Sequence, residues 1–462
     1  MSQIKQSKKV LIIAGEFPPI KTIGRLRTAK FAQHLQSLGW TPIILTLETT
    51  SANHDSSLEN EIADNLEIYR VPKPDLEQII VHKIKSLLKI AAKPNSSITA
   101  ENTAPATKVE QSPNNKINLK DKAIHYFKQI LKYIVYTPDD FNLWAYQAEK
   151  TATDICNKHH IDIIYTTLPP FSSCHVGYMI KNKFNIPWVV DYRDLWFGDV
   201  LREWIPTARQ KLELFYEQRY MGKADAIISV SEQKTAFLKK LHPKSKAIWE
   251  TITNGYDNEV FEPLLAKLRQ TNEYINFVYT GRLFKNRKGY AFAEALGQLC
   301  LENTDLKNKV RVHILGGVTD EIQHRYNQIL QQYDIEECYI FTGDISYQKA
   351  MAAQVNADHL LLIVDTGLTS DGVIPGKLFE YIASRRPIFA LTDPGATQEI
   401  IEKSGSGIVV PAESIEQCKI ELRKVLQEPV KDNYQADLVY LEQFDRKVLT
   451  ARLARLFDQI KK

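Results

Sequence analysis

Short apolar runs alternate with stretches of helical periodicity along most of the chain. Residues 10–14 (VLIIA) form one such run, and positions 26–38 then place apolar side chains three or four residues apart before Gly39. A buried parallel strand followed by a helix gives this pattern. Further apolar runs predict strands at 40–45, 161–165, 188–190, 226–230, 275–279, 310–315, 339–342, 360–364 and 387–391.

The predicted strands form two series that are separated by a turn-rich stretch at 254–257. Alternating strands and helices are typical of doubly wound α/β domains. The pattern predicts an N-terminal domain over 1–254 and a C-terminal domain over 255–436, with helical sequence at 437–462. A chain of 462 residues is long enough for both. Closure of the two domains about 254–257 would exclude water from a site between them.

Charge is unevenly distributed along the chain. The whole chain has a net charge of +4, too little to indicate a nucleic-acid partner. Residues 78–135 contain ten lysines, no arginine and three acidic residues, and the rest of the chain is net negative. Two stretches of this segment have the spacing of basic amphipathic helices. The segment is either an insertion that packs on the N-terminal domain or a region that docks on an anionic membrane surface.

The cysteines and the length of the apolar runs indicate in which cellular compartment the protein works. The five cysteines are scattered and include no CxxC pair, which fits a reducing environment without disulfides or a zinc site. No apolar run approaches the roughly 18 to 20 residues that span a bilayer, and the N-terminal run is too short for a signal peptide. We expect a cytoplasmic protein that can lie on the inner face of the cytoplasmic membrane.

Polar residues follow the predicted strands of the first domain. The first loop contains Gly24, and Asp191, Arg193 and Asp194 follow the strand at 188–190. Ligands of parallel α/β sheets bind at this edge, where carboxylates and a guanidinium can position sugar hydroxyls or a phosphate. The alternative is an internal pair of Arg193 with either aspartate. The absence of GxGxxG excludes a dinucleotide fingerprint and disfavours an NAD-dependent oxidoreductase.

A basic loop follows the first strand of the second domain. Residues 280–289 (TGRLFKNRKG) carry four cations and no acid at the start of a predicted helix. Helix N-termini favour anions, and Gly281 and Gly289 let a ligand approach the backbone, so the loop suits a phosphate. A solvated basic loop is the alternative.

A third motif lies at 371–383 (DGVIPGKLFEYIA). Lys377, Glu380 and Ser384 fall on one face of a predicted helix. A lysine suits phosphate oxygens, and a carboxylate accepts hydrogen bonds from a diol such as ribose. A surface ion pair of Lys377 with Glu380 is the alternative.

Taken together, these motifs resemble those of the retaining glycosyltransferases of family 4, of the bacterial cell-surface polysaccharide type. The resemblance rests on FPP at 17–19, LGW at 38–40, TTLPPFS at 166–172 and DYRDLW at 191–196, together with the two C-terminal motifs. It implies a GT-B fold of two facing Rossmann-like domains, with 437–462 crossing back to the first. It also implies sugar transfer from a nucleotide diphosphate sugar to a saccharide or lipid-linked saccharide.

The resemblance assigns roles to individual residues. Arg282 and Lys288 become catalytic, because they would neutralise the leaving diphosphate. Acceptor or sugar positioning falls to Gly24, Asp191, Arg193 and Asp194. Donor binding falls to Gly281, Gly343, Ile345, Gly372, Lys377, Leu378 and Glu380. Many relatives have a glutamate where this chain has Gly372. No metal and no cofactor are expected.

Two other readings of a GT-B chain stay open. One is a sugar-nucleotide epimerase or a phosphorylase, which would need other acid and base groups or pyridoxal phosphate. The other is a non-catalytic protein that binds a glycan or a partner. The sequence does not identify the donor base, sugar or acceptor.

Overall fold

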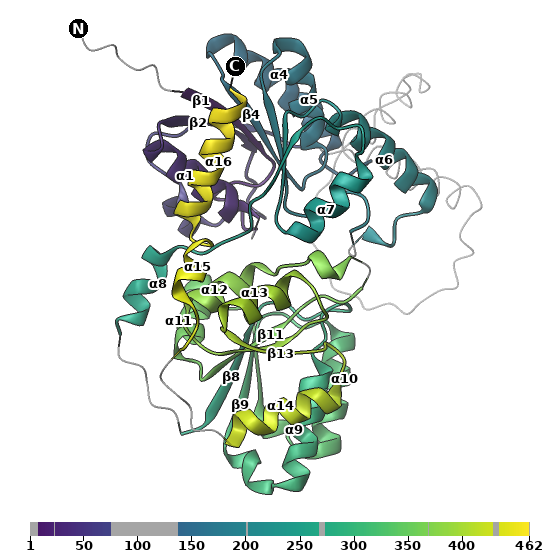
Figure 1. Cartoon of the computed structure of the whole chain (residues 1–462), viewed down its shortest axis with the longest axis vertical. Coiled ribbons are helices and arrows are strands. Elements are labelled where there is room, and N and C mark those ends of the chain that lie inside the picture. The colour runs from purple at the N-terminus through teal and green to yellow at the C-terminus, as the bar shows by residue number, and fades with distance from the viewer. Residues whose placement is uncertain are drawn as a thin grey trace, which may run out of the picture.

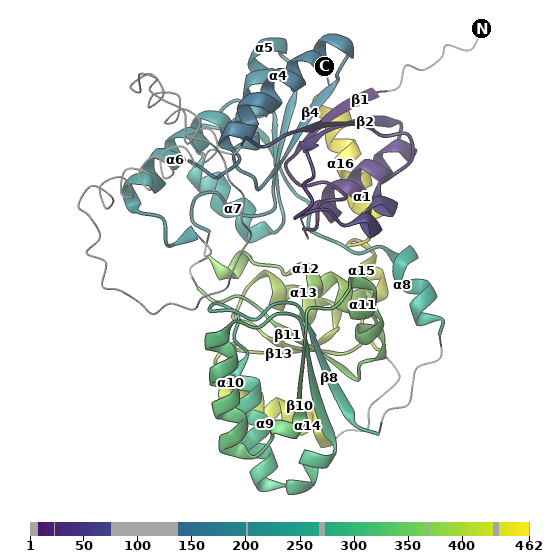
Figure 2. The same ribbon diagram turned by 180° about the vertical axis from the view of Figure 1, so that it is seen from behind.

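The computed structural model describes residues 8–22, 24–74, 137–199, 202–267, 273–367, 369–427 and 434–461. They form two sheet domains, one above the other in Figures 1 and 2. The basic segment predicted at 78–135 lies outside the described residues. Within the described ranges, no helix is long and apolar enough to cross a bilayer.

The N-terminal sheet has seven strands among the described residues, all paired in parallel. In spatial order they are β3 (Glu67–Val71), β2 (Trp40–Leu47), β1 (Lys8–Ala14), β4 (Ile163–Leu168), β5 (Trp188–Tyr192), β6 (Ala226–Ser229) and β7 (Ile248–Thr251). The helices along this part of the chain are η1 (Ser56–Glu61), α1 (Arg25–Ser37), α4 (Asn142–Lys158), α5 (Ser173–Phe184), α6 (Thr207–Met221) and α7 (Glu232–Leu241).

The C-terminal sheet has six strands among the described residues, again all parallel. In spatial order they are β10 (Tyr339–Gly343), β9 (Val310–Leu315), β8 (Ile275–Thr280), β11 (His359–Ile363), β12 (Ile388–Leu391) and β13 (Gly407–Val410). The α-helices are α8 (Asn258–Leu265), α9 (Tyr290–Glu302), α10 (Asp320–Tyr333), α11 (Tyr347–Asn356), α12 (Gly376–Ala383), α13 (Ala396–Ser404) and α14 (Ile415–Gln427). Short 3₁₀ turns are η3 (Thr304–Asn308), η4 (Glu336–Cys338) and η5 (Ser370–Gly372).

These two parallel sheets with helical connections confirm the predicted doubly wound architecture. Three strands, β3, β7 and β13, lack a counterpart among the predicted apolar runs. All three are end strands of their sheets and are mostly half-buried. An end strand is covered less completely by neighbours, so its sequence needs fewer apolar residues and gives a weaker signal.

Within the described residues the chain crosses between the domains twice, and the two crossings pair with each other. The Tyr256 amide donates to the Phe444 carbonyl oxygen (3.1 Å), and the Arg446 amide donates to the Tyr256 carbonyl oxygen (2.9 Å). A Cβ at Gly255 would lie 2.2 Å from the Phe444 carbonyl oxygen, so only glycine fits there. The 254–257 linker therefore runs beside a second connection.

The second crossing leads through α15 (Leu438–Glu442) into α16 (Arg446–Ile460). Helix α16 packs beside α1 on the N-terminal sheet, as both views show. Its Phe457 ring contacts Trp40, with 5.2 Å between ring centroids. The C-terminal end of the chain thus belongs to the core of the first domain.

Candidate functional site

Loops that follow strand ends of the two sheets meet between the domains. The Ser231 hydroxyl, after β6, donates to the Gly372 carbonyl oxygen, after β11, at 2.7 Å. The Thr369 hydroxyl donates to the Gly198 carbonyl oxygen, also at 2.7 Å. Because ligands of parallel sheets bind beyond the carboxyl ends of the strands, this is the region where a site is expected.

Lys377 has a buried ammonium group without a hydrogen-bond partner. It lies in the first turn of α12, and its Nζ is 3.9 Å from the centre of the Tyr279 ring. A Cβ at Gly281 would lie 2.7 Å from this Nζ, so the glycine gives the lysine room. Burial, and then the nearby Arg287 charge, hold the pKa of Lys377 well below its usual value. A bound anion would reverse that effect and supply the missing partner.

Arg287 and Asp365 complete this cluster. Their side chains form an ion pair of 2.6 Å, yet Arg287 Nε and Asp365 Oδ1 have no partner of their own. Buried polar atoms are normally paired, so unpaired donors and an acceptor near one lysine are unusual. Arg287 was one of the four loop cations, but the sequence did not single it out from its neighbours. Asp365 was missed, although its position just after β11 could have indicated it.

Glu380 lies one helical turn beyond Lys377. Burial raises the pKa of its carboxyl group, while Gln354 Nε2 donates to Oε2 at 3.1 Å. Gln354 also donates to Thr280 Oγ1 at the end of β8 (3.0 Å), which fixes the amide. Ser384 is fully buried, and its hydroxyl donates to the Glu380 carbonyl oxygen. The predicted helix face is therefore available to a ligand at Lys377 and Glu380 only.

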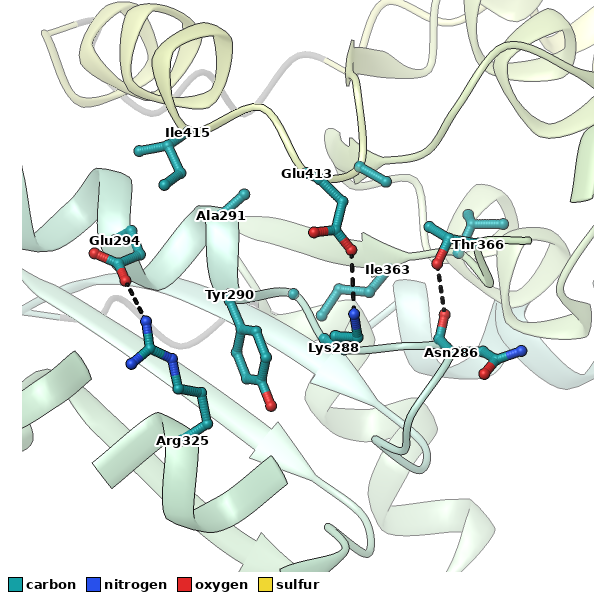
Figure 3. Close-up of a pocket in the computed structure, with 13 residues that line it drawn as sticks. Asn286, Lys288, Tyr290, Ala291, Glu294, Arg325, Ile363, Thr366, Glu413 and Ile415 are labelled. Carbon is teal, nitrogen blue, oxygen red and sulfur yellow. Dashed lines mark hydrogen bonds and ion pairs between the residues drawn. The ribbon is translucent and has the colours of Figure 1, made fainter. Parts of the chain in front are cut away.

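Neither of the two expected catalytic cations is buried as the Lys377 ammonium is. Arg282 is exposed next to Gly281, and Lys288 Nζ is 3.5 Å from Glu413. Figure 3 shows Lys288 and Glu413 facing each other. Both residues line a pocket with a volume of about 140 Å³. Lys377 is not among the residues that line this pocket. Arg287, the neighbour of Lys288, is close enough to the buried lysine for its charge to lower the pKa of Lys377.

The other expected donor residues differ in what they offer. Gly281 (φ +116°) and Gly343 (φ +73°) adopt backbone conformations that favour glycine. Ile345 packs partly against the core, and Gly372 lies against Lys234 of α7. Leu378 is fully buried and its amide donates to Pro375, so neither group is free to meet a ligand.

Asp191 forms a buried ion pair and does not face a ligand at the surface of the domain. Its carboxylate has no solvent exposure and accepts two hydrogen bonds from Arg27 of α1, at 2.8 and 2.9 Å. The Tyr165 hydroxyl donates to the same group. Arg27 also donates to the carbonyl oxygens of Ile252 and Thr253, just before the linker. Asp191 thus anchors the entrance of the interdomain crossing.

Arg193 and Asp194 interact with other residues and do not form the internal pair that the sequence left as an alternative. Arg193 donates to the Leu168 and Pro169 carbonyl oxygens and pairs with Glu16 of the first loop at 3.2 Å. A Cβ at Gly24 would lie 1.9 Å from Arg193 Nη1, so the first loop packs tightly on this guanidinium. Asp194 is exposed, 3.7 Å from Lys234 Nζ.

Comparisons with known proteins agree with this architecture. Residues 275–428 match the family model described as glycosyl transferases group 1, so the C-terminal sheet domain has the sequence pattern of that family. No curated protein sequence matches the chain.

Solved structures resemble the whole chain. Sucrose-phosphate synthase from Thermosynechococcus elongatus is 16% identical, with a TM-score of 0.62 over 98% of this chain and 99% of that one. A glycosyltransferase from Rickettsia africae is 14% identical, with a TM-score of 0.62 over 99% of both chains. Anabaena HepE in complex with UDP and glucose is 12% identical, with a TM-score of 0.60 over 98% of this chain and all of that one. These similarities confirm the predicted GT-B fold.

Proposed function

We propose that this protein is a retaining glycosyltransferase of the family 4 type. It moves a sugar from a nucleotide diphosphate sugar to a saccharide or lipid-linked saccharide in surface polysaccharide assembly, at the inner face of the cytoplasmic membrane. The observation that carries the proposal is the unpartnered Lys377 ammonium beside Gly281, one turn from Glu380. The group 1 match over the same domain and the fold shared with the UDP complex of HepE support it.

In this proposal the donor lies along the loops after β8, β9, β10 and β11. Lys377 and Arg287 face the diphosphate, and the Glu380 carboxylate accepts hydrogen bonds from the ribose hydroxyls. Gly343 and Ile345 border the base. Exposed Arg282 approaches the outer phosphate. Lys288 also approaches the outer phosphate once its ion pair with Glu413 breaks. Breaking this pair costs little free energy, because exposed ion pairs are weak.

Sugar transfer then proceeds by front-face displacement. The bond from the anomeric carbon to the leaving phosphate oxygen breaks while the acceptor oxygen bonds to the same face. The acceptor proton passes to the leaving phosphate oxygen. Fixed cations stabilise the negative charge that develops on the diphosphate, so no protein base and no metal are required. Arg193 and Asp194 border the acceptor side, and the buried ion pair of Asp191 with Arg27 holds the end of β5 from which they extend.

The donor site is tested by thermal unfolding with UDP, GDP, ADP and CDP. A nucleotide present at 100 times its dissociation constant stabilises by about 2.7 kcal/mol. We expect one nucleotide to raise the melting temperature, and Lys377→Ala to abolish the rise. Lys285→Ala is the matched control, because Lys285 is an exposed lysine of the same basic loop. Absence of a shift with all four nucleotides contradicts the proposal.

The competing readings predict different products. Incubation of the donor without acceptor would yield an epimerised nucleotide sugar if the protein were an epimerase. A phosphorylase would release a sugar phosphate from a glycan and inorganic phosphate. A transferase yields a new glycoside only when an acceptor is present, and Lys377→Ala stops its formation. A non-catalytic protein gives none of these products.

A further inference from the structure

Helix α6 turns an apolar face to solvent. Leu212 and Phe215 of this helix are 49% and 59% exposed, and Trp204, shortly before it, is 71% exposed. Tyr216 extends the patch, with its ring 5.7 Å from that of Phe215. We call the exposed residues Trp204, Lys211, Leu212, Phe215, Tyr216 and Arg219 the α6 face. Figures 1 and 2 show α6 on the outer side of the N-terminal domain, away from the C-terminal sheet.

The acidic residues of α6 point the other way. Glu213 accepts hydrogen bonds from Trp196 Nε1 (3.0 Å) and Arg209 Nε (2.6 Å) in the domain interior. Glu217, which is fully buried, accepts from the Tyr192 hydroxyl at 2.9 Å. The charged residues left on the exposed side of α6 are therefore Lys211 and Arg219. Exposed Glu203 lies beside Trp204, but on α6 itself the apolar stripe is flanked by cations, which is unusual on a surface that meets water alone.

The chain also re-enters the described ranges beside this helix. The Pro138 carbonyl oxygen accepts hydrogen bonds from Arg202 (3.4 Å) and Arg209 (3.0 Å), near the start of α6. The basic sequence 78–135 ends just before this point. The chain thus enters the described part of the N-terminal domain near the start of α6.

We propose that the α6 face docks onto the surface of an anionic lipid bilayer. Leucine, phenylalanine and tryptophan side chains bury in the boundary between headgroups and acyl chains, and lysine and arginine meet the lipid phosphates. A symmetric contact with a second copy fits less well, because a twofold interface would bring like charges of the two faces together. The proposal does not depend on the transferase reaction, since it concerns a different surface.

Tryptophan fluorescence of the full chain tests this proposal. Of the six tryptophans, four are at most 2% exposed and Trp204 is the most exposed, while 78–135 contains none. We expect vesicles with 30% phosphatidylglycerol and brominated acyl chains to quench the fluorescence, and Trp204→Phe to remove most of the quenching. Vesicles of phosphatidylcholine with the same brominated acyl chains should quench the tryptophan fluorescence at least fivefold less than the phosphatidylglycerol vesicles do.

Co-sedimentation with the same vesicles provides the matched comparison. Leu212→Ser/Phe215→Ser should lower the bound fraction at least fivefold. The control Leu301→Ser/Val439→Ser alters residues that are 65% and 78% exposed elsewhere, and it should bind as wild type does. Both variants should keep the wild-type melting temperature and nucleotide-induced shift.

Three outcomes would overturn the proposal. They are quenching that Trp204→Phe leaves unchanged, equal binding of the two double variants, and a wild-type dimer in solution that the α6 variant dissociates. The rise in melting temperature with a nucleotide tests the transferase proposal separately, so failure of the membrane proposal can be told from failure of the transferase proposal.

Discussion

The Ser231 hydroxyl of the N-terminal domain donates a hydrogen bond to the Gly372 carbonyl oxygen of the C-terminal domain, at 2.7 Å. A Cβ at Gly372 would lie 2.9 Å from Lys234 Cγ, so the two loops are in close contact. Domain opening must break this contact. Gly372 thus serves the contact between the domains in this chain.

Ser231→Ala should favour the open arrangement of the domains. A hydrogen bond of this kind contributes about 1 kcal/mol, so the population ratio of closed to open protein should fall about fivefold. Small-angle scattering should show a larger radius of gyration than wild type at the same nucleotide concentration. Ser231 also caps α7, so the control is Ser346→Ala, which removes the equivalent cap of α11. Equal radii for the two variants would contradict the prediction.

Binding of a nucleotide diphosphate should take up protons at pH values above the lowered pKa of ligand-free Lys377. Burial lowers the pKa of Lys377 in the ligand-free protein, and a bound phosphate raises it again. Titration calorimetry in two buffers of different ionisation enthalpy measures this uptake. Lys377→Arg should bind without uptake, because arginine stays charged. Uptake that is equal in wild type and Lys377→Arg would refute the assignment.

Lys377 should also make the stability of the ligand-free protein depend on pH. Its folded-state pKa is below the unfolded value of about 10.5. The unfolded state therefore binds more protons between these two values, and the lysine destabilises the fold less as the pH rises. Urea unfolding from pH 7 to 9.5 should show the stability of wild type approaching that of Lys377→Met. A constant difference between them would contradict this reasoning.

Arg27→Ala should destabilise the N-terminal domain severely. The substitution leaves the Asp191 carboxylate buried without its cation. It also removes the hydrogen-bond donor of the Ile252 and Thr253 carbonyl oxygens. Removing one partner of a buried ion pair costs about 3–5 kcal/mol. The control Lys403→Ala breaks an exposed pair with Glu399 and should cost less than about 0.5 kcal/mol in the same urea titration. Similar losses for both variants would contradict the prediction.

Asp257 should link acid unfolding to the interdomain crossing. Burial by itself would raise its pKa, but His34, Arg446 and Lys30 outweigh burial and hold the pKa below its usual value. The folded state thus binds fewer protons than the unfolded state, so this stabilisation is present at pH 7 and lost as the pH falls below about 4.

Asp257→Asn should therefore cost about 2 kcal/mol at pH 7 and less at pH 3.5. Urea titrations at both pH values measure the two costs. Asp334→Asn is the control, because its pair with Lys307 is exposed and should contribute little at either pH. A cost of Asp257→Asn that does not change with pH would show that the carboxylate charge is not the cause.

The sequence by itself determined the two-domain parallel architecture. Central strands such as β1 and β11 are covered on both faces, and their continuous apolar runs are visible without any partner. Lys377 and Glu380 could also be paired in advance, because the pitch of one helix fixes their spacing. Residues within one element follow local geometry, so sequence reasoning reaches them.

Only the tertiary structure decided the partners of the loop residues. It pairs Asp191 with Arg27, far away in the sequence, and it brings the charge of Arg287 near Lys377 while Lys288 pairs with Glu413. It also buries the acidic residues of α6 and leaves that helix with an apolar, cationic face. The physical reason is that the direction of a loop or surface side chain depends on which distant groups can satisfy its charge, and spacing along the chain does not encode those groups.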